Sequence, residues 1–156
     1  MTNLVIPAPP PAVAETAIVS STFWPSIDPA KVREAQRIDA TVTPARLRAA
    51  LIEAVATTNT ALLAWRSAQQ AAGFATLAEV PAETIDTESL HAHRYRRAVG
   101  SLAKALLLER LRDFDATGKG DKDAAALTDP IDDCRRDWHA AVADIAGRPR
   151  STVELI

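Results

Sequence analysis

The sequence predicts an all-α fold: a small helical bundle with two long helices and two shorter ones, an extended N-terminal arm and a C-terminal tail. The chain has 156 residues, the length of one domain. It is rich in alanine and has only 5 glycines, a composition that favours helix. Apolar side chains also recur at helical spacing through stretches without glycine or proline. We expect an arm over residues 1–22, a helical domain over 23–148 and a tail over 149–156.

The N-terminal arm is predicted to be extended. Four prolines lie between Pro7 and Pro11, and each fixes φ and removes a backbone donor. Such a segment buries little surface by itself, so we expect it to be mobile in the free protein. No basic segment precedes an apolar run near Met1, so we expect no signal peptide. No apolar run is long enough to span a bilayer, and no membrane partner is expected.

A short helix is expected to begin at Asp28-Pro29 and to continue to about Ile38. Aspartate is a good N-cap and proline a good first helical residue. Val32 and Ile38 would provide its apolar contacts. Two adjacent aromatic residues, Phe23 and Trp24, precede it. They are interpreted either as an anchor in the core or as candidate assembly contacts with a partner.

A long helix is predicted from Thr43-Pro44 to Ala72, because no glycine or proline interrupts it before Gly73. It would be roughly 40 Å long. Its apolar stripe consists of Leu47, Leu51, Val55, Leu62 and Trp65.

The segment 73–86 is predicted to be a connector, packed down by Phe74, Leu77 and Val80. A second long helix should follow from Thr87 to about Ala116, capped by Asp86 or Thr87. Its run Ala105–Leu108 is apolar on every side, so this helix is expected to be central.

The last helix is expected to begin with Asp129-Pro130 and to end at Gly147. Its apolar face would consist of Ile131, Cys134, Trp138, Val142 and Ile145. Beyond it, Ser151–Ile156 alternates and contains β-forming residues. No other convincing strand is visible, so this tail would lack a partner strand in its own chain.

The stretch RDFDATGKGDKDA, residues 112–124, imitates a calcium-binding loop. The loop positions that match are occupied by Asp113, Asp115, Thr117, Gly118 and Asp121. The final position requires a bidentate glutamate and here is Ala124. A phosphate-binding loop needs a different spacing after a strand. The stretch is therefore interpreted as a connector.

The remaining polar residues do not form a recognisable catalytic pattern, so we expect no enzyme activity and no cofactor. His91 and His93 would point roughly 200° apart on a helix, which prevents them from chelating one metal ion. His139 lies near Asp137, but no nucleophile can be assigned to this pair. Cys134, the only cysteine, excludes an internal disulfide and is interpreted as a core residue.

Binding to nucleic acid is weakly indicated. Arg94, Arg96 and Arg97 surround Tyr95 and could contact a phosphate backbone. The alternative is a solvated helix face with the tyrosine turned inward. The net charge of −2 provides no basic field that would hold DNA. Lys119 and Lys122 are balanced by neighbouring aspartates.

Several separate blocks of the chain resemble phage head completion/stabilisation proteins, the gpL type of temperate phages with contractile tails. The first block is TFWPSIDPAKVRE, residues 22–34. The others, in order, are Thr43–Arg48, Ala72–Ala82, Ile85–Ser89, Ala116–Lys122 and Arg148–Arg150. The resemblance covers nearly all of the chain after the proline arm and is weaker in the last helix.

The resemblance implies a virion component at the head–tail junction, made in the cytoplasm of the bacterial host. Its partners would be the portal protein, a tail or tail-completion protein, other copies in a twelvefold ring, and double-stranded DNA bound without sequence specificity. A rival interpretation is a DNA-binding packaging factor similar to a small terminase subunit.

Two sets of residues are candidate contact sites in such an assembly. Lys119 and Lys122, with Phe23 and Trp24, are candidate assembly contacts. The alternating tail is the candidate portal-binding segment, acting as an added β-strand. It comprises Pro149, Arg150, Ser151, Thr152, Val153, Glu154, Leu155 and Ile156.

Overall fold

The computed structural model describes residues 15–116 and 128–149, and their fold confirms the all-α prediction. The helices are α1 (Pro29–Ala35), α2 (Pro44–Ala61), α3 (Leu63–Ala71), α4 (Leu90–Ala116) and α6 (Thr128–Ala146). A short 3-10 turn, η1 (Leu77–Glu79), and two short strands, β1 (Thr84–Ile85) and β2 (Glu88–Ser89), lie between α3 and α4.

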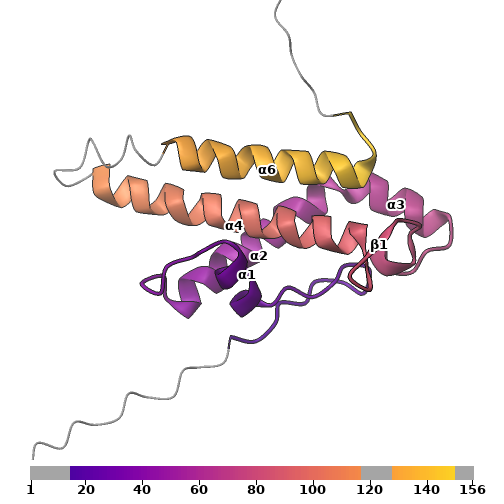
Figure 1. The fold of residues 1–156 in the computed structure, drawn as a ribbon, viewed down its shortest axis with the longest axis horizontal. Coiled ribbons are helices and arrows are strands. Elements are labelled where there is room, and N and C mark those ends of the chain that lie inside the picture. The colour runs from indigo at the N-terminus through magenta and orange to yellow at the C-terminus, as the bar shows by residue number, and fades with distance from the viewer. Residues whose placement is uncertain (1–14, 117–127, 150–156) are drawn as a thin grey trace, which may run out of the picture.

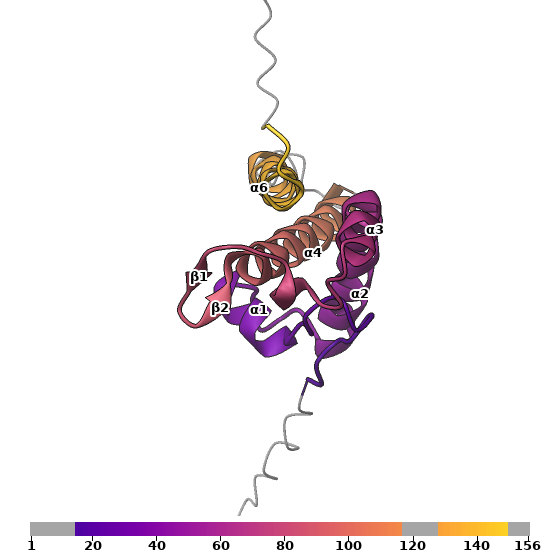
Figure 2. The same ribbon diagram turned by 90° about the vertical axis from the view of Figure 1, so that its right-hand side faces the viewer.

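Helix α4 is the centre of the molecule, as its apolar run predicted. Helix α6 lies antiparallel beside it, and α2 crosses its other side (Figure 1). Seen along α4, the remaining elements surround it, with α6 on one side and α1, α2 and the β-hairpin on others (Figure 2). Small buried side chains on α4 allow its neighbours to approach closely; they include Ala98, Ala103 and Ala105.

An aromatic cluster joins the segment before α1 to the helices. The Trp24 and Tyr95 rings stack with their centroids 4.7 Å apart. Phe23 meets Trp24 edge-on at 4.8 Å and Trp65 at 6.3 Å. The Phe23 carbonyl accepts a hydrogen bond from the backbone N–H of Leu77 at 2.8 Å. This cluster therefore fixes the N-terminal segment, α3, the connector and α4 to one another.

The packed part of the chain begins before residue 23, the predicted start of the helical domain. Ile18 is buried and forms an antiparallel bridge with Ile27, with N···O distances of 2.7 and 2.9 Å. Glu15 pairs with Arg33 at 2.8 Å. Residues 15–22 thus belong with the folded part rather than with the predicted arm, whose residues 1–14 lie outside the described ranges.

The predicted helix ends and caps are confirmed where a residue next to the boundary indicates them. Asp28 Oδ1 accepts from the Ala30 N–H at 2.9 Å, and Thr43 Oγ1 accepts from the Arg46 N–H at 3.4 Å. Gly73 has a φ of +101° just after α3, a conformation that favours glycine. Buried Leu77 and Val80 hold the connector down, as predicted.

The predicted long helix from Thr43 to Ala72 is interrupted, which corrects the sequence-based expectation. Leu62 leaves helical geometry, with φ −101° and ψ 6°, and separates α2 from α3. Its side chain is fully buried. Neither glycine nor proline marks this break, so tertiary packing rather than local propensity accounts for it.

The predicted start of the second long helix at Thr87 is also wrong. Asp86 and Thr87 have φ values of 49° and 65° and form the two-residue turn of a β-hairpin. Neither residue caps α4, which begins at Leu90. The expectation of no further strand is therefore corrected by β1 and β2, although each has only two residues.

Two other boundaries differ slightly from the prediction. Helix α1 ends at Ala35, before the predicted Ile38, because the chain turns at Arg37 with a φ of 50°. Val32 and Ile38 are nevertheless buried as predicted. Helix α6 begins at Thr128, and Cys134 on it is half-buried rather than part of the core.

Two leucines on the α2–α3 segment test which face forms the core. We expect Leu51→Ala to lower the free energy of unfolding by about 2–5 kcal/mol, because Leu51 is fully buried. Leu63→Ala is the matched control, since that side chain is 57% exposed, and should change it by about 0.5 kcal/mol or less. Urea denaturation measures both; equal losses would contradict the packing.

The hairpin turn provides a second test of stability. Thr87→Gly should raise the free energy of unfolding by about 0.5–1 kcal/mol, because a β-branched residue at φ 65° is strained and glycine is not. Thr84→Gly, in the adjacent strand β1, should lower it. Destabilisation of similar size by both changes, measured by thermal unfolding, would argue against this turn.

Candidate functional site

Most of the predicted contact residues lie outside the described ranges. Of the tail, only Pro149 is described, and it is exposed just after α6. Arg150–Ile156 fall outside the described residues, as do Lys119 and Lys122. The side chains of the aspartate–glycine stretch from Asp113 onward do so too. The roles predicted for these residues remain predictions.

Phe23 and Trp24, the other candidate assembly contacts, are buried within the aromatic cluster. Phe23 is 1% and Trp24 4% exposed. The Arg66 guanidinium also covers the Phe23 ring, at 5.5 Å from its centroid. This burial favours the interpretation of the pair as an anchor in the core over a direct contact with a partner.

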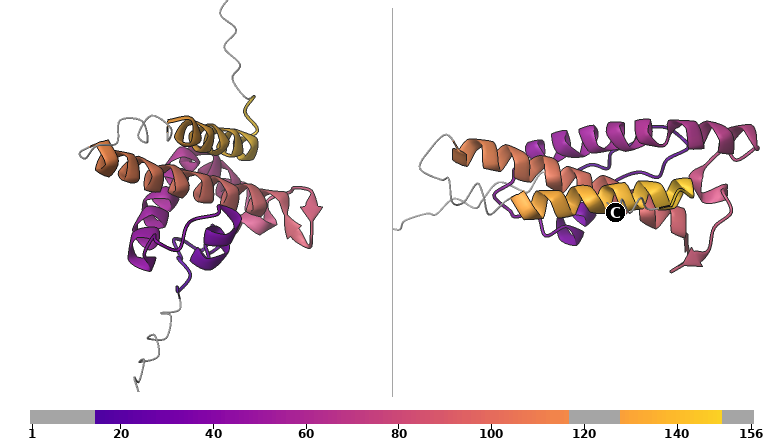
Figure 3. Two further views of the ribbon diagram at one scale, coloured as in Figure 1. Left: turned by 60° about the vertical axis from the view of Figure 1, so that its left-hand side comes forward. Right: turned by 90° about the horizontal axis from the view of Figure 1, so that it is seen from above.

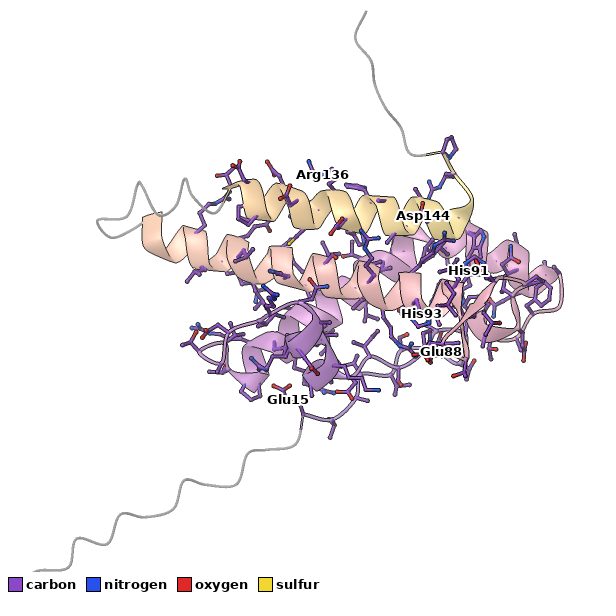
Figure 4. The ribbon with its side chains drawn as sticks, in the orientation of Figure 1. Glu15, Glu88, His91, His93, Arg136 and Asp144 are labelled. Atoms are coloured by element: carbon purple, nitrogen blue, oxygen red, sulfur yellow. The ribbon has the colours of Figure 1, made fainter. Side chains whose placement is uncertain are left out.

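The three arginines around Tyr95 are each paired with an acid. Arg94 Nε lies 3.9 Å from Asp144 Oδ2, and Arg97 Nη2 lies 2.8 Å from Asp137 Oδ1, both on α6. Arg96 donates two hydrogen bonds to the Glu88 carboxylate in β2. Figure 4 shows Glu88 and Asp144 near opposite sides of α4. Because each positive charge has a partner, this face is not a basic patch.

Tyr95 points inward, as one of the two alternatives predicted. Its side chain is fully buried, and its hydroxyl donates to Asn59 Oδ1 at 2.7 Å. Burial raises the pKa of Tyr95 well above its usual range, so the hydroxyl remains a donor. The hydrogen bond from Arg96 lowers the pKa of Glu88, which keeps that ion pair charged.

The two histidines predicted to diverge are held by different neighbours (Figure 4). His91 meets the Trp65 ring edge-on at 5.4 Å, and its partial burial lowers its pKa. His93 Nε2 lies 2.9 Å from the carbonyl oxygen of Ile85 in the hairpin. Within residues 15–116 and 128–149, no group of three or more His, Cys, Asp or Glu side chains is placed to hold a metal ion.

Two exposed features were missed by the sequence analysis. The first is the tip of the β-hairpin, where Ile85 is 46% exposed beside Glu83 and Asp86. The second is a groove of about 520 Å³ between the α1–α2 turn and the C-terminal half of α4. Its apolar lining comprises Ile38, Val42, Leu107, Leu108 and Leu111. No spacing in the sequence signals this groove, because its lining comes from segments far apart in the chain.

None of the helices in the described residues is both long enough and apolar enough to cross a membrane.

Comparison with known proteins places this arrangement in a viral context. The family model described as phage head completion protein (GPL) matches residues 18–156. The head completion/stabilization protein of Escherichia phage P2 is 47% identical over 148 residues, which cover 95% of this chain and 88% of that protein. No solved structure gave a significant match. The chain, a helical bundle built around α4, belongs to the phage head completion protein (GPL) family.

Proposed function

We propose that this head completion protein binds the portal vertex of a DNA-filled phage head, helps to retain the DNA and provides the surface to which the tail attaches. The observation that carries the proposal is the family match over residues 18–156, together with a relative named for head completion and stabilization. The protein would act as a virion component without enzymatic activity or cofactor, after synthesis in the cytoplasm of the bacterial host.

The distribution of charge suits a protein that surrounds moving DNA. The net charge is −2, and the arginines of α4 nearest to Tyr95 are paired with Glu88, Asp137 and Asp144. Many phosphate contacts would hold the duplex and slow its exit. A face whose arginines are neutralised in this way would instead let DNA pass.

The architecture suits assembly into a ring on the portal, which we propose to be twelvefold. Rigid helices α4 and α6 lie side by side along most of their length (Figure 3). Pro149 is exposed where the chain leaves α6. Polar and apolar residues alternate over Thr152–Leu155, and we propose that Ser151–Ile156 add as a β-strand to a sheet of the portal or of a neighbouring subunit.

Truncation tests the tail. Removal of the residues after Arg148 should abolish stoichiometric binding to the portal protein of the same phage, measured by co-sedimentation. The helices should remain, because α6 ends at Ala146. Circular dichroism of the truncated chain provides the control. Full-strength binding by the truncated chain would exclude the tail as the portal-binding segment, and absent binding by the full-length chain would exclude the proposed function.

Binding to free duplex DNA tests the charge argument. We expect weak binding with a shallow dependence on salt, because the net charge is −2 and the arginines around Tyr95 are paired with acids. Arg97→Ala should not change it, since that guanidinium is already paired with Asp137. Filter binding between about 50 and 200 mM salt provides the measurement. Tight binding with a steep salt slope would instead favour a DNA-binding packaging factor.

A further inference from the structure

The β-hairpin is a rigid acidic projection with an apolar tip. The Ile85 carbonyl is bonded to His93, the Glu83 carbonyl accepts from the Leu90 N–H at 2.8 Å, and Glu88 is held by Arg96. These contacts fix the hairpin on the first turns of α4, from which it projects away from the bundle (Figure 3). Within the described part of the chain, Glu83 and Asp86 form no ion pair, so the tip presents two free negative charges beside Ile85.

The groove matches the apolar tip of the hairpin and carries the opposite charge. Its floor is formed by leucines of α4, and Leu111 at its edge is 49% exposed. Four cations line it, Arg37, Arg46, Lys104 and Arg110, against one acid, Asp39. Among residues 15–116 and 128–149 none of these four cations forms an ion pair. The groove therefore offers an apolar surface with an excess of positive charge.

The hairpin cannot occupy the groove of its own chain. It lies at the N-terminal end of α4, whereas the groove lies along the C-terminal half of that helix (Figure 1). Leu90 and Leu108 are roughly 27 Å apart along the helix, at about 1.5 Å per residue. Any docking of the two features must therefore join two different molecules.

We propose that the hairpin tip of one copy, Glu83–Asp86, docks into the α1–α2/α4 groove of the next copy. Ile85 would contact the leucine floor, and Glu83 and Asp86 would face the cations of the groove. Because the two surfaces differ, the contact is head-to-tail, and repetition of such a contact closes into a ring when its rotation allows. The inference rests on the proposed assembly on the portal and specifies the contact that joins its subunits.

The hairpin tip alone would bury less surface than a stable interface, which usually buries more than about 1,000 Å². It would act as the central anchor of a wider contact, which the rigid portal surface supports by bringing copies together. Complementary charges at such a contact determine register and suppress wrong pairings more than they increase affinity. Charge reversal is therefore a direct way to test it.

The experiment uses three charge-reversed forms of the full-length chain and counts copies per portal by native mass spectrometry. Glu83→Lys with Asp86→Lys reverses the hairpin, and Arg46→Glu with Arg110→Glu reverses the groove. We expect each of these two forms alone to leave incomplete rings. The fraction of portals that carry a complete ring should fall at least 10-fold. The third form carries all four changes and should recover complete rings, because complementarity between copies is restored. Glu53→Lys, on the exposed face of α2 and outside both surfaces, is the control for a charge reversal elsewhere on the molecule.

A cross-link provides a second measurement that does not depend on weakened binding. In a Cys134→Ser background, Ile85→Cys with Leu111→Cys should give a ladder of disulfide-linked multimers on the portal, and either cysteine alone should not. Complete rings from both one-sided reversals, no recovery in the fourfold variant, or absence of the ladder would overturn this contact while the proposed function stands. Failure of the unaltered chain to bind the portal would overturn both.

Discussion

The enclosure of α4 is the constraint on which the rest of the structure depends. Its small side chains at Ala98 and Ala103 let other elements approach closely, and Tyr95 accepts the stacked ring of Trp24. An N-terminal segment that would otherwise be free is thereby inserted into the core, and it carries the connector with it through the bond between Phe23 and Leu77. Burial of apolar and aromatic surface on several sides of one helix is what a chain of this length needs to form a single core.

This enclosure also decides where partners can bind. Because α2, α6 and the aromatic cluster occupy much of α4, open surfaces remain towards the ends of the bundle: the hairpin around Ile85, the groove beside Leu111, and the exit of the chain at Pro149. Opposite ends with opposite charge are suited to repeated head-to-tail contacts. The paired arginines of α4 leave the middle of the molecule with little attraction for DNA, which agrees with a role in head completion rather than in sequence recognition.

The sequence predicted features that have a local cause. Asp28 and Thr43 cap helix starts with their side-chain oxygens. Gly73 indicates a helix end, because glycine tolerates a positive φ. The break at Leu62 has no local signal, because leucine is a good helix former and only its burial accounts for it. The turn at Asp86-Thr87 lacks the glycine that usually marks such a hairpin. The groove and the acid partners of the arginines join residues far apart in the chain, so spacing alone could not reveal them.

We propose that this protein completes the head by forming a ring at the portal vertex. The most direct test of this proposal is single-particle imaging of DNA-filled heads that were produced without this gene and then mixed with the purified chain. We expect twelve copies as a closed ring below the portal, with DNA retained in heads that otherwise lose it. Copies bound over the capsid shell, or none bound to heads with an intact portal, would contradict it.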